Sequence, residues 1–169
     1  MSVNYQTFPK SMATPPLVKS LVEVVKAHHT DINSERFQLA SNDVLSIIRS
    51  DVEALGFEVE RGKSANDKVK VPVLYGLNGL TAKTFDADGF NRIQGIVLEV
   101  EAGRAVSNYQ FLKDLFQACA MQEAKHLVIA VRNIYGTNKD FNSVITFLET
   151  LYASSRLVLP LESVTIVGY

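Results

Sequence analysis

Hydrophobic residues at helical spacing predict two amphipathic helices in the first third of the chain. Apolar positions recur every three or four residues from Leu17 to Val25, and this pattern ends near His28 and His29. The segment SNDVLSIIRSDVEALGF opens with small polar residues that favour a helix N-terminus, keeps one apolar face and stops at Gly56. We therefore predict helices from 17 to about 28 and from 42 to 55.

Short strands are predicted in the middle of the chain. The segments FEVERG (57–62), VKVPVLYGL (69–77) and GIVLEVEA (95–102) have strand character, and polar or glycine-containing turns separate them. The piece LTAKTF (80–85) either extends the middle strand or forms a strand of its own. Together these segments suggest an antiparallel meander.

The second half alternates helical and strand patterns. Helical periodicity runs through AVSNYQFLKDLFQACAMQEA (105–124) and KDFNSVITFLETLYASSRL (139–157), whereas HLVIAVRNI (126–134) and LESVTIVGY (161–169) read as strands. The continuous apolar run of the first of these strands is typical of burial on both faces, and a helix between two strands implies a parallel crossover. The predicted class is α/β, with a mixed central sheet flanked by helices.

Composition fits a single domain over 1–169. The chain has 169 residues and is 47% hydrophobic, which is enough to bury a sizeable core. The first 15 residues hold three of the five prolines and no periodicity, so we expect an extended N-terminal arm there, mobile or packed on a partner. The single cysteine, Cys119, is expected to serve packing. Because no apolar run reaches the about 20 residues of a membrane span and no leader-like pattern opens the chain, we expect a soluble, cytoplasmic protein.

Charge limits the nucleic-acid-binding surface to a local patch. The net charge is -1 and the pI is near 6.3, without the strongly basic balance of many nucleic-acid-binding proteins. The densest positive stretch is ERGKSANDKVK, with Lys63, Lys68 and Lys70. These lysines either follow a DNA backbone near a metal site or form a solvated hairpin tip. No P-loop, dinucleotide-binding glycine pattern or serine-hydrolase elbow is present in the sequence.

Four acidic residues in FDADGFNRIQGIVLEVEAGR are the strongest chemical signal. Side chains alternate faces along a strand, so Glu99 and Glu101 lie on the same face, opposite Leu98. Two partly buried carboxylates repel each other unless a cation neutralises them, and Mg²⁺ prefers oxygen ligands. Asp86 or Asp88, on the turn before the strand, could be brought alongside by antiparallel pairing. The alternative is an exposed sheet face with solvated acids.

Strand order and acids together resemble the PD-(D/E)xK nuclease superfamily, whose restriction-endonuclease-like core runs α-β-β-β-α-β. The match covers about 42–134, and it leaves an extra N-terminal helix and a C-terminal α-β unit. Asp86 or Asp88 resembles the family's first acid, Glu99 resembles the second, and Glu101 stands where lysine is usual. Some restriction endonucleases in the family have Glu-x-Glu at this position. The resemblance implies Mg²⁺, or Mn²⁺ in its place, held by these acids, with Glu101 as ligand or general base.

Further residues are assigned by the same resemblance. Arg104 or Lys113 would stabilise the phosphate in the transition state, although Arg104 could equally cap the strand and Lys113 could be a surface lysine. Asp43 resembles an acid that many members add from the first core helix, and its alternative role is helix capping. Asn108 could hydrogen-bond a phosphate near a helix N-terminus, or act as a plain N-cap.

The expected function is a metal-dependent DNA endonuclease, with a restriction or defence system as its expected setting. Because a chain of this length leaves little room for target recognition, a homodimer, a partner subunit or loose specificity is expected. The alternative is a catalytically inactive relative that serves as a binding or assembly module. In a third reading the likeness is only a common α/β arrangement, with the glutamates serving a sugar or another metal-dependent hydrolysis.

Overall fold

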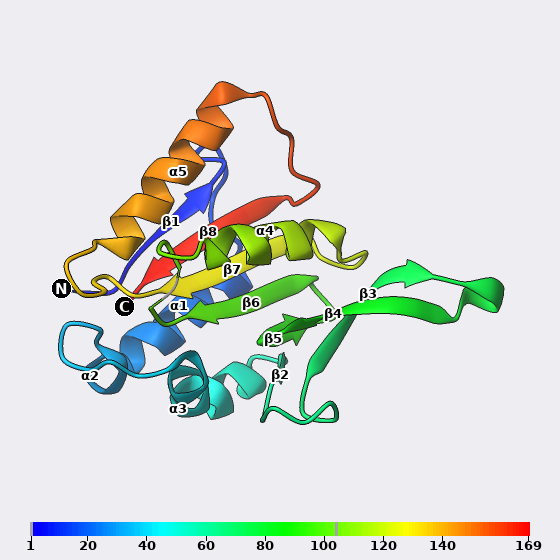
Figure 1. Ribbon diagram of the computed structural model, residues 1–169, viewed down its shortest axis with the longest axis horizontal. Helices are drawn as coiled ribbons and strands as arrows, with labels where there is room; N and C mark the ends of the chain where they lie inside the picture. The colour runs from blue at the N-terminus through cyan, green and yellow to red at the C-terminus, as the bar shows by residue number, and fades with distance from the viewer. Residues whose placement is uncertain (1, 104) are drawn as a thin grey trace.

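The computed structural model describes residues 2–103 and 105–169, which fold around a mixed sheet with helices on both faces (Figure 1). Six strands pair in the order β1-β8-β7-β6-β5-β2, and two more form a separate hairpin, β3-β4. The strands are β1 (Asn4–Phe8), β2 (Glu58–Val59), β3 (Val69–Tyr75), β4 (Thr81–Ala87), β5 (Gly89–Asn91), β6 (Ile96–Glu101), β7 (His126–Val131) and β8 (Ser163–Gly168). The helices are α1 (Pro16–Ala27), α2 (His29–Ile32), α3 (Ser41–Ala54), α4 (Gln110–Ala120) and α5 (Asp140–Ser154), with a 3-10 turn η1 (Leu77–Gly79).

Three parallel strands form the centre of the sheet. β6 pairs with β7 and β7 pairs with β8, each in parallel, and α4 and α5 make the two crossovers. The edges are antiparallel, because β1 pairs with β8 on one side and β5 and β2 follow β6 on the other. The mixed sheet and its parallel crossover are confirmed.

Alternation along the central strands builds two separate cores. Leu98 and Val100 of β6 pack with the helices α1 and α3, whereas Val97 packs with α4 and α5 on the opposite face. Figure 1 shows these helix pairs on the two sides of the sheet. The face that carries Val97 is therefore also the face that carries Glu99, and α4 covers it.

Most predicted elements are confirmed, and three expectations need correction. The expected N-terminal arm contains β1, an edge strand whose five residues pair with β8 and end at the buried Phe8. An unpredicted short helix, α2, follows α1. The antiparallel meander in the main sheet is β2-β5-β6, because β3 and β4 pair only with each other over most of their length and project from the body (Figure 1).

The hairpin leaves the sheet at Asp88. This residue separates β4 from β5, so the same stretch of chain pairs first with β3 and then with β2. Three-residue β5 is too short to show periodicity, which is why the sequence pattern did not reveal it. Across the part of the chain that the structure describes, no helix has the length and apolar character needed to cross a bilayer.

Candidate functional site

A small acidic cavity lies where β4, β5 and β6 meet α4. It has a volume of about 260 Å³, and we call it the acid pocket. Its charged lining residues are Glu60, Lys68, Asp86, Asp88, Glu99, Glu101, Lys113 and Asp114. Six carboxylates and two lysines therefore converge on one end of the sheet.

Backbone pairing places Asp88 beside Glu99. Gly89 is the register partner of Leu98, so the residue before Gly89 lies next to the residue after Leu98 in the antiparallel pair. The carboxylate of Asp88 is held there, because its Oδ2 accepts a hydrogen bond from the Val100 N–H at 2.7 Å. The position of the Asp88 carboxyl group, between β4 and β5, is thus fixed by the main chain of β6.

Strand alternation buries Glu99 under α4. Glu99 is only 9% exposed, while Glu101, at the end of β6, is partly exposed. Both lie on the face that carries Val97, as the period-two pattern predicts. The alternative of an exposed, solvated sheet face is wrong for Glu99.

A further carboxylate comes from α4. Asp114 is 2% exposed, and its Oδ2 has no hydrogen-bond partner. Its Oδ1 lies 3.9 Å from the Nζ of Lys113, a side chain that is 60% exposed. A buried carboxylate oxygen without a partner is costly, so this atom is open to a ligand that supplies positive charge.

Burial and mutual repulsion raise the pKa of these acids. Burial raises the pKa of Asp88 to about 6, although the Val100 N–H opposes the shift. Burial, with the negative charge of Asp114, raises the pKa of Glu101 to about 8. The pKa of Glu99 rises well above its usual range through burial and then through Asp88 and Asp114. Burial also raises the pKa of Asp114, and a side-chain hydrogen bond with Glu101 and then the charge of Lys113 oppose this.

Glu60 differs from the other buried acids because it is paired. Its carboxylate is 5% exposed and lies 2.6 Å from the Nζ of Lys68. The hydrogen bond to Glu60 raises the pKa of Lys68. The pair closes one side of the acid pocket, and the described geometry thus gives Lys68 an intramolecular partner.

The structure brings together only part of the predicted site. Asp88, Glu99, Glu101 and Lys113 line the acid pocket, and Asp86 lies exposed at its rim. The other candidates do not line it: Asp43, Lys63, Lys70 and Asn108 are exposed elsewhere. Arg104 lies outside the described residues.

Asp43 instead serves the start of α3, where its Oδ2 accepts a hydrogen bond from the Ala40 N–H at 3.2 Å. This is the capping role that was its alternative. Lys63 and Lys70 are both exposed, Lys63 in the loop before β3 and Lys70 within β3. Their contact with DNA stays a prediction.

Sequence reasoning missed Glu60 and Asp114. The buried face of α4 consists of Phe111, Asp114, Leu115 and Ala118, and Phe116 does not belong to it. Phe116 is 57% exposed. The sequence did contain a signal for Asp114. It lies three residues after Phe111 and four before Ala118, so helical spacing puts it on the same face as these two.

The donor chemistry of the pocket suits a hard divalent cation. Most of its charged side chains are carboxylates, whose oxygens Mg²⁺ and Mn²⁺ prefer, and the unpartnered Oδ2 of Asp114 could accept a cation. Within 2–103 and 105–169, no three His, Cys, Asp or Glu side chains are arranged to hold a metal ion as they stand. Binding would therefore require the carboxylates to draw together.

Fold and site together define a mixed α/β protein with a crowded carboxylate pocket at the edge of its parallel strands. A comparison with models of known protein families gives no match, and neither does a comparison with curated protein sequences.

Proposed function

We propose that the protein is a metal-dependent DNA endonuclease with a restriction-endonuclease-like fold, which hydrolyses phosphodiester bonds with Mg²⁺. The observation that carries the proposal is the convergence of Asp88, Glu99, Glu101 and Asp114 in one pocket, with an unpartnered buried oxygen on Asp114. Such a cluster is unfavourable without a cation. Divalent cations held by carboxylates are a common solution for phosphate chemistry.

The order of elements supports the fold assignment. From α3 the chain runs through β2 and β3, then β4 and β5, then β6, α4 and β7. When β2 and β3 are counted as one strand, and β4 and β5 as a second strand that bends at Asp88, the order becomes α-β-β-β-α-β. This is the order of the PD-(D/E)xK family. Asp88 at the bend and Glu99 on the next strand then resemble the first and second acids of that family.

Asp88, Glu99 and Asp114 are the residues that would hold the cation, with Glu101 as a further ligand or as the general base. When bound, the cation polarises a phosphoryl oxygen and lowers the pKa of nearby water. Glu101 is the more exposed glutamate of β6, and a bound cation would offset the burial and repulsion that raise its pKa to about 8, so that its carboxylate would accept a proton from an attacking water. Lys113, on the rim, supplies positive charge toward the phosphate.

The alternative is a binding or assembly module that has lost catalysis. The observation in its favour is Glu101 itself, which stands where the resembling family usually has lysine. In that case the carboxylate pocket would be a remnant, and the protein would bind neither Mg²⁺ nor Mn²⁺ at millimolar concentration.

Calorimetric titration of Mn²⁺ into wild type and Glu99→Gln tests the proposal, followed by nicking of supercoiled plasmid with both proteins. Glu23→Gln is the matched control, because Glu23 is an exposed glutamate on α1, far from the pocket in sequence and on another helix. We expect binding and nicking in wild type and the control, and loss of both in Glu99→Gln. Absence of Mn²⁺ binding to wild type would sink the nuclease and leave the binding module.

A further inference from the structure

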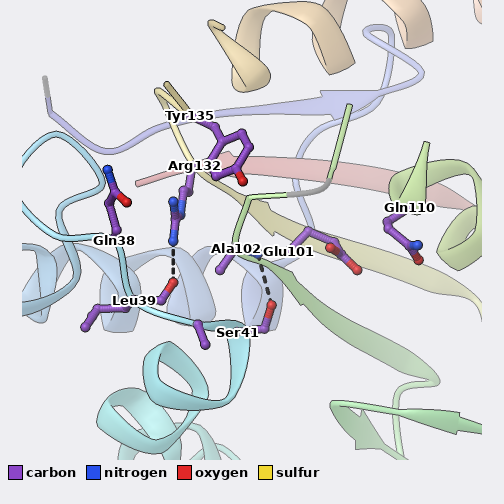
Figure 2. A pocket seen from close by; sticks show the side chains of 9 residues that line it. Gln38, Leu39, Ser41, Glu101, Ala102, Gln110, Arg132 and Tyr135 are labelled. Atoms are coloured by element: carbon purple, nitrogen blue, oxygen red, sulfur yellow. Dashed lines mark hydrogen bonds between the residues drawn. The ribbon is translucent and has the colours of Figure 1, made fainter. Parts of the chain in front are cut away.

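A second cavity adjoins the acid pocket at the carboxyl ends of β6 and β7. It has a volume of about 510 Å³, and we call it the Arg132 pocket. Its lining residues are Gln38, Leu39, Ala40, Ser41, Glu101, Ala102, Gln110, Arg132 and Tyr135. Figure 2 shows Arg132 and Tyr135 in the middle, with Gln38 on one side and Glu101 and Gln110 on the other. The volume is within the about 300–1,000 Å³ of small-ligand sites, and parallel sheets bind ligands at this end.

Arg132 gives the pocket a fixed positive charge. The residue is only 4% exposed, and its guanidinium donates a hydrogen bond to the backbone carbonyl of Leu39 (Figure 2). A guanidinium has five N–H donors. The Leu39 carbonyl uses part of this capacity, the Tyr169 hydroxyl and the carboxylate of Asp140 lie nearby, and the remaining donors are left for a ligand. Its cationic carbon lies 5.2 Å from the centroid of the Tyr135 ring, a cation-π contact that holds both groups in one wall.

The ring of Tyr135 is held against the end of β6 by two local features. Tyr135 and Asn138 exchange backbone hydrogen bonds of 2.9 Å in each direction, which fixes the loop after β7. Gly103 follows β6, and a Cβ there would lie 2.6 Å from Cε2 of Tyr135. Glycine at this position therefore allows the ring to lie close to the strand that carries the acids, and 36% of Tyr135 stays exposed.

The two pockets are neighbours. Ser41 and Glu101 line both of them, so a strand whose phosphate lies over the acid pocket can place an adjoining nucleotide in the Arg132 pocket. An aromatic ring, a guanidinium and two glutamine amides match a base and its phosphate: aromatic and Arg side chains stack on bases, and Arg binds phosphate.

We propose that the Arg132 pocket is a nucleotide subsite, which takes a base against Tyr135 and the adjoining phosphate on Arg132. The subsite rests on the proposed nuclease function, since its place in the reaction is beside the phosphate that would be cleaved. Such a subsite requires a nucleic-acid strand with a base that is free to stack on Tyr135, as at a strand end, a gap or an unpaired position.

Binding of a short single-stranded tetradeoxynucleotide that contains 2-aminopurine tests the subsite without metal. The full chain has no tryptophan, so the fluorescence of the probe can be read directly in EDTA buffer. Tyr135→Leu is expected to weaken binding roughly 5- to 150-fold, the range found when a base loses an aromatic partner. Tyr135→Phe keeps the ring and is expected to bind like wild type. Tyr75→Leu is the matched control, because Tyr75 is 50% exposed on the hairpin.

A second variant keeps the test independent of any folding defect in Tyr135→Leu. Gly103→Ala keeps the tyrosine but crowds its ring, and at a φ of +110° it also strains the backbone, so thermal unfolding is measured beside binding. We expect weaker probe binding while the circular dichroism spectrum stays native. Equal binding by wild type and Tyr135→Leu, or no binding by wild type at millimolar protein, would overturn the subsite.

The same proteins separate failure of the subsite from failure of the nuclease. Wild type that nicks plasmid but does not bind the probe would refute only the subsite. Wild type that binds the probe through Tyr135 but neither binds Mn²⁺ nor nicks would refute the nuclease and leave a nucleotide-binding pocket. Glu23→Gln should bind the probe like wild type, because Glu23 lines neither pocket.

Discussion

Neutralising Asp88 should stabilise the metal-free protein at pH 8. The Asp88→Asn variant removes the carboxylate that burial makes costly, and its amide oxygen can still accept the hydrogen bond from the Val100 N–H. The variant therefore isolates the free energy of charging this position from the loss of a backbone contact.

The magnitude follows from the shifted pKa. A rise from 3.8 to about 6 corresponds to about 3 kcal/mol in the free energy of unfolding, at about 1.36 kcal/mol per pH unit. A pKa raised in the folded state means that the folded protein holds its proton longer than the unfolded chain. The contribution of Asp88 is thus fully present below about pH 4 and is lost as the pH rises through about 6.

Thermal unfolding in EDTA, followed by circular dichroism, measures the effect. Wild type and Asp88→Asn should unfold together near pH 4, and at pH 8 the variant should unfold about 6–12 °C higher, at about 2–4 °C per kcal/mol for this chain length. Asp86→Asn is the control, because Asp86 is exposed at the rim of the same pocket and should change stability by less than about 0.5 kcal/mol. A variant no more stable than wild type at pH 8 would refute the idea that charge at Asp88 is costly.

Two further outcomes follow from the packing and the site. Mn²⁺ at about 100 times its dissociation constant should stabilise wild type by about 2.7 kcal/mol in thermal unfolding, and it should leave Glu99→Gln unchanged; an equal gain in both would place the ion elsewhere. Leu98→Ala should cost about 2–5 kcal/mol in urea unfolding, because Leu98 is fully buried between β6 and the helices α1 and α3; a cost below 1 kcal/mol would contradict that core.

The sequence predicted what periodicity can encode. The long helices and the alternation that places Glu99 and Glu101 on one face are strong local patterns, and the structure confirms them. β1 escaped prediction because an edge strand is defined by its pairing with β8, 158 residues away in the Thr7–Thr165 contact. β5 escaped prediction for another reason, because three residues are too few to show a strand pattern.

The composition of the acid pocket was harder to predict than its location. Asp114 is a single charge within a helical pattern, and its burial depends on how α4 rotates onto the sheet. Lys68 sits in a basic stretch that reads as a solvated hairpin tip, yet its Nζ binds the buried Glu60. The burial of Asp114 and the ion pair of Lys68 both depend on contacts between elements that are separate in the sequence. A local sequence pattern carries no information on such contacts.

Two buried acids of the same pocket should respond in opposite directions to neutralisation. Glu60 has the cation of Lys68 at 2.6 Å, so Glu60→Gln should lower stability by about 1.5–3 kcal/mol, the range for a hydrogen bond to a charged group. Burial raises the pKa of Asp114, so Asp114→Asn, which removes the buried charge, should raise the stability of the metal-free protein at pH 8.

Urea unfolding at pH 8 in EDTA, repeated with Mn²⁺, makes the comparison. If the pocket binds a cation, the order should reverse for Asp114, because wild type gains the ligand and Asp114→Asn gains less. If Asp114→Asn stays more stable than wild type with and without Mn²⁺, Asp114 takes no part in metal binding. Destabilising buried acids are expected where function requires them. If Asp114 binds no metal, its carboxylate has no part in metal-dependent cleavage, and this result would favour the binding module.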